Sequence, residues 1–450
     1  MNKNMTQGPV MKTMLQFAIP MILGNLLQQC YNIADTLIVG KFLGSNVLAA
    51  VGSSFTLMTF ITSILLGLCM GSGTFFSIRF GEKDEKGLKE GICASFLLTL
   101  FLTAVINILS YLFLDSIQAF LKVPDKVWHD MRIYLSIIFI GIPATFLYNY
   151  FASLLRAIGN SIIPLIFLAV SAVLNIALDL WFVLGLHWGA AGAAAATVAS
   201  QYAAGIGITI YSVLYIPYLK MKKEERRLRW SCMQEIAGFS VMTCIQQSVM
   251  NLGILLVQGV VNSFGAEVMA AFAAAVKIDA FAYMPVQDFG NAFSTFIAQN
   301  FGAKQNNRIR AGLKGAIITV FLFCLTVSAA VCIFARPLML LFVNAKETAI
   351  IAHGVRYLRI EGSFYCGIGC LFLLYGFFRA MEKPGMSVVL TFISLGTRVA
   401  LANILSAIPS IGESGIWWSV PIGWILADFV GFIFVNYFYL DKHRNTSYNS

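Results

Sequence analysis

Phe80-Gly81-Glu82-Lys83 ends one long apolar run of this sequence, and Phe301-Gly302-Ala303-Lys304 ends another, 221 residues further along the chain. Other identities at this offset are Gly44 with Gly265, Phe60 with Phe281, Thr74 with Thr295 and Gly91 with Gly312. An offset of 223 pairs Tyr134-Leu135 with Tyr357-Leu358 and Arg156-Ala157 with Arg379-Ala380. Chance matching of Ala- and Phe-rich helices explains poorly why the identities share an offset and the same loop positions. We infer an internal duplication.

The apolar runs between these landmarks are long enough to cross a membrane, which takes roughly 20 apolar residues. The runs lie near 14–39, 48–77, 91–115, 131–154, 161–186, 190–217, 235–261, 268–298, 312–336, 352–378, 386–408 and 415–440. Six fall in each half, so both halves enter the membrane in the same sense. We expect an all-α polytopic membrane protein with about twelve transmembrane helices in two parallel-repeat six-helix bundles. The expected parts are an amino-terminal lobe (1–219), a basic cytoplasmic linker (220–234) and a carboxy-terminal lobe (235–450).

Composition excludes a soluble protein. Hydrophobic residues make up 58% of the chain and charged residues 12%, with a mean hydropathy of +0.78, whereas soluble domains carry about 25% charged residues. The net charge of +10 sits in short loops, which indicates membrane orientation and no nucleic-acid partner. Loops on the side of the two termini hold 21 lysines and arginines, against 7 on the other side. Positive loops face the cytoplasm, so we expect both termini to be cytoplasmic in a multi-pass protein of the bacterial inner membrane.

Cysteine and histidine usage favours neither a metal site nor redox chemistry. The nine cysteines fall mostly inside apolar runs and form no CxxC motif, and the four histidines are scattered. The sequence also shows no nucleophile–base set and no phosphate-binding glycine loop near an interface. We therefore expect no cofactor beyond a coupling ion, and no enzymatic activity.

Two polar stripes interrupt the apolar helices of the first half. One carries Gln28, Tyr31, Asn32 and Asp35, and the other carries Ser171, Asn175 and Asp179, at spacings of three and four that place each set on one helix face. Asn149 and Thr197 on neighbouring helices could join them. Carboxylate, amide and hydroxyl oxygens suit Na+, with Asp35, Asn175 and Asp179 as its ligands, or a proton, because burial disfavours the charged carboxylate. The alternative is that these carboxylates are hydrogen-bonded structural contacts between helices.

The second half has different buried chemistry. Lys277 and Asp279 precede Gln287, Asp288 and Asn291 around Pro285, and Met284 shares a face with Asp288 and Asn291. Together with Gln28 and Asn32, we take Lys277, Asp279, Met284, Gln287, Asp288 and Asn291 as substrate-cavity candidates. The alternative for Lys277 and Asp279 is an internally neutralised structural pair. We further expect an Arg398–Asp428 pair, interfacial positions for Arg359 and Glu361, and headgroup contacts for Arg156 and Arg379.

The chain resembles the MATE (multidrug and toxic compound extrusion) family over nearly its whole length. The matching segments are Asn32-Ile33-Ala34-Asp35-Thr36-Leu37-Ile38-Val39-Gly40, Arg156-Ala157-Ile158-Gly159-Asn160 followed by Pro164, Asn175-Ile176-Ala177-Leu178-Asp179 and Gln299-Asn300-Phe301-Gly302-Ala303. Tyr31, Asp35, Asn149, Asn175, Asp179 and Thr197 match the amino-lobe cation site of the DinF-like branch in residue type and spacing. Where the NorM-like branch has a glutamate on the seventh helix, this chain offers Gln246, Gln247 and Asn251.

The resemblance implies a V-shaped antiporter that exports amphiphilic organic cations in exchange for Na+ or H+ by alternating access. Its expected partners are membrane lipids and small cationic substrates, and we expect a monomer. The first alternative is a lipid-linked oligosaccharide flippase of the same superfamily, which would need a cationic cavity, for which Lys277 and Arg398 are the candidates. A membrane enzyme, receptor or channel is less compatible with the parallel duplication and the absence of a filter-like segment.

Overall fold

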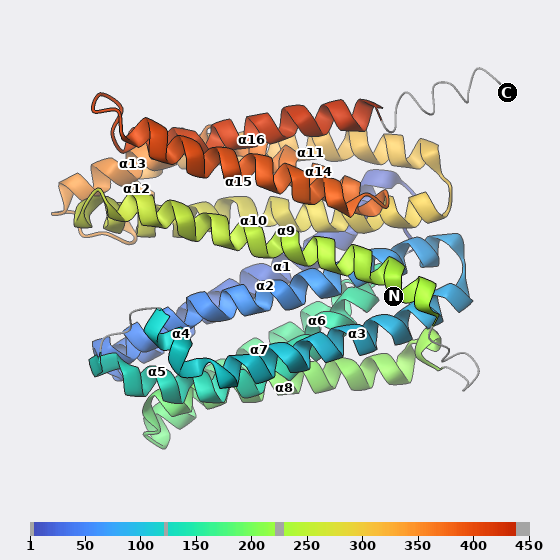
Figure 1. The fold of residues 1–450 in the computed structure, drawn as a ribbon, viewed down its shortest axis with the longest axis horizontal. Helices are drawn as coiled ribbons and strands as arrows, with labels where there is room; N and C mark the ends of the chain where they lie inside the picture. Colours follow the sequence, from blue (N-terminus) through green and yellow to red (C-terminus); the bar gives the residue numbers. More distant parts are fainter. Residues whose placement is uncertain (1–3, 121–124, 221–228, 438–450) are drawn as a thin grey trace. The chain divides into compact units, whose positions relative to one another are not determined.

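The computed structural model describes residues 4–120, 125–220 and 229–437, and almost all of them are helical (Figure 1). Eleven helices in these ranges are long and apolar enough to cross a membrane. A twelfth candidate span is the pair α13 (Thr348–Gly362) and α14 (Tyr365–Ala380), which is bent by 51° at its break. The expectation of an all-α protein with about twelve spans is confirmed.

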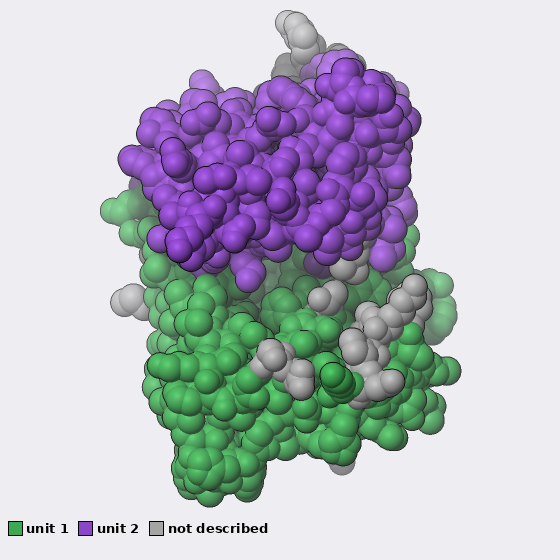
Figure 2. Space-filling model, turned by 90° about the vertical axis from the view of Figure 1, so that its left-hand side faces the viewer, with its two compact units in different colours: residues 1–8, 12–248, 298–305 green, residues 9–11, 249–297, 306–450 purple. Residues whose placement is uncertain are grey.

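The chain divides into two compact units (Figure 2). The first consists mainly of Lys12–Ser248 with Ala298–Gln305, and the second mainly of Val249–Ile297 with Asn306–Ser450. The boundaries fall inside α9 (Trp230–Asn262) and α10 (Ala266–Gly302), so each of these two long helices contributes to both units. The lobes 1–219 and 235–450 stay a prediction from the repeat.

The first unit is a helical bundle whose buried apolar residues form separate clusters. Its remaining elements are α1 (Val10–Phe42), α2 (Gly44–Glu82), α3 (Glu85–Leu112), α4 (Leu114–Phe120), α5 (Asp125–Ile138), η1 (Phe139–Gly141), α6 (Ile142–Ala157), α7 (Ile162–Asp179), η2 (Leu180–Gly185), α8 (Gly189–Tyr215) and η3 (Pro217–Leu219). Val39 of α1 is fully buried against Tyr134, Val183 and Val198. This packing fixes the carboxy-terminal part of α1, next to Asp35, against α5, η2 and α8.

The second unit is held by an aromatic core. It contains α11 (Asn306–Ile333), α12 (Ala335–Leu340), α15 (Pro384–Ser406) and α16 (Ser414–Val435), besides α13, α14 and parts of α9 and α10. Phe272 stacks on Trp417 with ring centroids 5.6 Å apart, and Tyr357 meets Trp417 edge-on at 5.0 Å. Such pairs add about 0.5–1.5 kcal/mol each beyond their burial. They bring α10, α13 and α16 together around the buried polar groups described below.

The helix bounds repeat between the two halves. Glu85–Leu112 and Asn306–Ile333 both have 28 residues and begin and end at the offset found in the sequence, and a short helix follows each. The fourth span of each half is also interrupted, by the 3₁₀ turn Phe139–Gly141 in the first half and by the break after Gly362 in the second. These matching interruptions agree with the internal duplication.

The two FG-x-K segments meet where α2 and α10 end, within the first unit. A Cβ on Gly81 would collide with the carbonyl oxygen of Gln299, and a Cβ on Gly302 would collide with that of Ile78. The Gln299 side chain also donates to the Ala157 carbonyl oxygen at 2.7 Å. The repeated glycines are therefore packing residues that allow two backbones to cross.

Several of the lysines and arginines on which the predicted orientation depends lie outside the described residues. They are Lys3, Lys122, the linker positions Lys222, Lys223, Arg226 and Arg227, and Lys442 and Arg444. The cytoplasmic placement of the termini and of the linker 220–234 therefore stays a prediction.

Candidate functional site

Asp35 of α1 and Asp179 at the end of α7 form the centre of the candidate site. Gly24 of α1 lies against Leu168 of α7, and this close helix contact brings the two carboxyl-bearing faces together. Asp179 is completely buried, whereas Asp35 is partly buried. The two carboxyls are close enough to hydrogen-bond to each other through one shared proton. Two carboxyls in such contact cannot both carry an uncompensated negative charge at low cost.

Acceptor oxygens without donors surround this pair. Among the described residues, both oxygens of Asp179, Oδ1 of Asp35 and Oδ1 of Asn175 are buried and accept no hydrogen bond from a donor group. Buried acceptors left unsatisfied cost about 1–3 kcal/mol each, and more when charged. Polar groups that serve as structural contacts between helices are hydrogen-bonded, whereas these acceptor oxygens lie together without donors. This arrangement suits a bound cation or proton.

The other predicted members of this site differ in their hydrogen-bond partners. The Asn175 amide nitrogen donates to Thr197 Oγ1 at 3.5 Å, and its amide oxygen accepts no hydrogen bond among the described residues. The Thr197 hydroxyl donates to Ala193 O. Tyr31 lies beside Asp35 and shares a hydrogen bond with Gln28. Asn149 donates to Thr145 O of its own helix at 2.8 Å and makes no hydrogen bond to the other members within the described ranges. The structure thus assembles Tyr31, Asp35, Asn175, Asp179 and Thr197 more tightly than Asn149.

The backbone is irregular directly after Asp179. The α-helix ends at that residue and continues as a π-helical turn, Leu180–Gly185. π-Helical turns are rare, and they occur frequently at functional sites. This turn is not predicted by any pattern in the sequence.

A second buried acidic cluster lies in the other unit and was missed in the sequence. The Tyr365 hydroxyl donates to Asp279 Oδ1. The Tyr357 hydroxyl lies 3.2 Å from Asp279 Oδ2 and 2.7 Å from Glu361 Oε2. A hydroxyl has one hydrogen and can donate to only one of these oxygens at a time, so the cluster is satisfied only when a carboxyl carries a proton. Tyr357, Glu361 and Tyr365 are spaced four residues apart, so a helical pattern places them on one face. This spacing is the feature of the sequence that could have indicated the cluster.

Three expectations for the second half are wrong. Glu361 is not interfacial but 1% exposed. Arg379 does not reach a headgroup: it is buried and donates to Asn291 Oδ1 at 3.1 Å. Arg398 forms no ion pair with Asp428 in the part of the chain described, and instead lies where its charge attracts Asp279 and Glu361. Glu361, Arg379 and Arg398 lie within the bundle because neighbouring helices supply polar or charged partners there.

Lys277 and Asp279 are not a neutralised pair. Asp279 is buried against the two tyrosines, whereas Lys277 is exposed on α10 and has no hydrogen bond or ion pair among the described residues. Of the other cavity candidates, Asp288 is buried and Gln28, Asn32, Met284, Gln287 and Asn291 are partly buried. Asn291 accepts a hydrogen bond from Arg379, and the role of the remaining members of the set in substrate binding stays a prediction.

The MatE family model matches this chain over residues 20–181 and 241–404. The chain belongs to the MatE family. The two matched segments start and end at the offsets of the internal repeat, which supports the duplication independently. The protein is therefore a membrane transporter of this family.

Relatives cover almost the entire chain. A protein named probable multidrug resistance protein YpnP, from Bacillus subtilis, is 30% identical over 96% of both chains. The multidrug export protein MepA of Staphylococcus haemolyticus is 25% identical over 95% of this chain and 94% of its own. A solved structure described as the outward-facing conformation of a multidrug resistance MATE family transporter matches with a TM-score of 0.90 at 23% identity, covering 96% of each chain. The fold of the MatE chain is thus that of solved MATE transporters.

Removing the Tyr365 hydroxyl should destabilise the second unit. Tyr365→Phe leaves Oδ1 of Asp279 without its donor, and an unsatisfied buried acceptor costs about 1–3 kcal/mol. We expect a lower midpoint of thermal unfolding for the purified protein. Tyr215→Phe is the matched control, because Tyr215 is 68% exposed. Equal midpoints for the two variants would show that the hydrogen bond to Asp279 contributes nothing.

Proposed function

We propose that this transporter is a cation-coupled antiporter that exports amphiphilic organic cations by alternating access, with H+ or Na+ as the coupling ion. The observation that carries the proposal is the cluster of buried, donor-free oxygens on Asp35, Asn175 and Asp179. A binding site of this kind is needed only if a positive species occupies it during the cycle.

The ligand set fits either coupling ion. Na+ takes oxygen ligands, and the two carboxylates with the Asn175 carbonyl oxygen supply them, while the Tyr31 hydroxyl lies beside Asp35. A proton would be shared between Asp35 and Asp179 in their mutual hydrogen bond. Both ions relieve the same repulsion between two buried carboxylates. The proposal therefore rests on this neutralisation, whichever ion supplies it.

Neutralisation is the step that moves the transporter. The coupling ion enters from the outer side, removes the repulsion between α1 and α7, and lets the two helices repack. A ligand shifts a conformational equilibrium only by its differential affinity for the two states. The ion must therefore bind one packing of α1 against α7 better than the other, and the substrate must prefer the opposite one.

The names of the relatives and the polar cavity candidates support the proposed substrate class. Relatives over the full length carry names of multidrug resistance and export proteins. Lipophilic cations suit walls of aromatic and methionine side chains with a carboxylate as counter-charge, for which Met284 and Asp288 on α10 are candidates. No covalent chemistry is required. We place the protein in the bacterial cytoplasmic membrane as a monomer, with both termini inside.

The flippase alternative has less support. It requires a cationic cavity for an anionic phosphate, and Arg398 is engaged by the acidic cluster of Asp279 and Glu361. Only Lys277 remains of the two candidates.

Transport in proteoliposomes separates the coupling ions. The purified protein is reconstituted, a fluorescent organic cation such as ethidium is supplied, and either a Na+ gradient or a pH gradient is imposed. We expect one gradient to drive export at a rate well above that of protein-free liposomes. Absence of transport with either gradient, in protein shown to be folded, would contradict cation coupling.

A further inference from the structure

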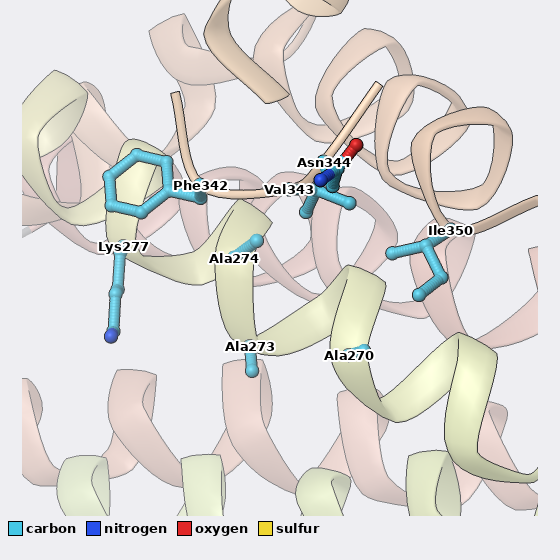
Figure 3. Close-up of a pocket in the computed structure, with 8 residues that line it drawn as sticks. All are labelled: Ala270, Ala273, Ala274, Lys277, Phe342, Val343, Asn344 and Ile350. Carbon is cyan, nitrogen blue, oxygen red and sulfur yellow. The ribbon is translucent and has the colours of Figure 1, made fainter. Parts of the chain in front are cut away.

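A cavity of about 450 Å³ lies in the second unit between α10 and the segment that joins α12 to α13 (Figure 3). Its floor is α10, where Ala273 and Ala274 lie three and four residues after Ala270. Because alanine carries only a methyl group, these positions leave a hollow along the helix surface. Phe342, Val343 and Ile350 form the apolar walls.

The two polar side chains that line this cavity both carry hydrogen-bond donors. Its polar side chains are those of Lys277 and Asn344. The Asn344 side-chain oxygen accepts a hydrogen bond from the backbone N–H of Lys346 at 3.1 Å. This leaves its NH₂ group to donate, and that group has no partner among the described residues. No carboxylate lines the cavity, so nothing there matches a cationic ligand.

Lys277 has no counter-charge within the described part of the chain. It lies about 16 Å along α10 from the start of the helix, at 1.5 Å per residue, and α10 is long and apolar enough to cross a membrane. The residues one turn away, Ala273, Ala274, Ala280 and Phe281, are apolar. Asp279 points to a different side of the helix and is held by tyrosines. An ionisable side chain within a membrane span is costly and is functional by default.

We propose that this cavity binds a small amphiphile with a single anionic group, a carboxylate, sulfonate or phosphate, which pairs with Lys277 while the apolar body lies over the alanine floor. Figure 3 shows Lys277 and Ile350 at opposite ends of the cavity, with Val343 and Asn344 between them. The charged group therefore sits at one end and the apolar body extends along α10. The volume falls in the range of pockets that hold drug-sized ligands, about 300–1,000 Å³, which favours a free amphiphile over a whole phospholipid.

This site shares Lys277 with the substrate-cavity candidates of the proposed export, but it uses none of the carboxylates that are proposed to bind the coupling ion. Its failure would therefore not bear on cation coupling. Binding is measured on the full-length purified protein in a neutral detergent. The probe is a fluorescent medium-chain fatty acid, compared with the same fluorophore and chain carrying a trimethylammonium head.

We expect the fatty acid to bind and its ammonium analogue not to bind. Lys277→Gln should weaken binding by about tenfold, the equivalent of about 1.4 kcal/mol, and Lys277→Arg should stay within about threefold of wild type. Ala273→Leu, which fills the floor and keeps the charge, should also weaken binding. Lys346→Gln is the control, because Lys346 is exposed and outside the lining.

Unchanged binding in Lys277→Gln, or equal binding of the two probes, would overturn the proposal. Competition in nanodiscs separates the two sources of the anionic group. If phosphatidylglycerol displaces the fatty acid and phosphatidylcholine does not, the occupant is a membrane lipid, and the assignment to a free amphiphile fails. If neither lipid displaces it, the assignment stands.

Discussion

Asp179→Asn is expected to abolish gradient-driven export while leaving the protein folded. Asparagine has the shape of a protonated aspartate but cannot release a proton or supply a charged ligand to Na+. Without coupling, the substrate can only equilibrate. One charge moving across 100 mV supplies about 2.3 kcal/mol, so the maintained substrate ratio should fall by up to about fifty-fold. The measurement is accumulation of a fluorescent organic cation in cells or proteoliposomes at matched expression.

Asp35→Asn should have a similar effect, because the two carboxyls act as one unit. Groups that act together give non-additive losses, so the double variant should be no worse than Asp179→Asn alone. Asp115→Asn is the control, since its carboxylate is 61% exposed beside Arg132. If both single variants export as well as wild type, the neutralisation mechanism is wrong. If their losses multiply in the double variant, the two carboxyls serve separate steps.

Gly81→Ala is expected to cause a large loss of stability. A methyl group at this position would collide with the carbonyl oxygen of Gln299, and neither backbone can yield without separating the ends of α2 and α10. Overpacking of this kind costs typically 1–3 kcal/mol and occasionally more. The thermal midpoint of the purified protein should fall, and the Gln299–Ala157 hydrogen bond should weaken with it. Gly302→Ala should behave likewise, because its added methyl meets the Ile78 carbonyl oxygen.

Gly238→Ala is the matched control for this prediction. It also lies inside a helix, α9, but nothing lies within 4 Å of an added Cβ there, so the change should be neutral or stabilising by up to about 1 kcal/mol. The double variant Gly81→Ala/Gly302→Ala should lose less than the sum of the single losses, since one crossing is shared. A midpoint for Gly81→Ala equal to that of Gly238→Ala would refute the packing role.

The sequence predicted the grouping of Asp35 with Asp179 better than it predicted the buried contacts of the second half. The stripes at Asp35 and Asp179 are visible because helical spacing alone decides which residues share a face. The sequence left open whether these carboxyls are structural contacts between helices. The structure disfavours that alternative, because the buried oxygens of Asp35 and Asp179 have no donors. In contrast, Glu361 and Arg379 were placed at the interface by their distance from the span ends. Their partners, Tyr357 and Asn291, come from helix packing that span counting does not address.

The sequence by itself indicated the duplication and about twelve spans, and it predicted that the two halves enter the membrane in the same sense. These follow from hydropathy and from identities at a fixed offset, which are local properties or pairwise comparisons along the chain. The tertiary structure decided which buried charges meet. Helix packing brings Asp35 next to Asp179, Glu361 next to Asp279 and Arg379 next to Asn291. It places Lys277 in the lining of a cavity together with Asn344. The physical reason is that a buried charge is stable only with partners, and those partners lie far away in sequence, where only helix packing brings them within reach.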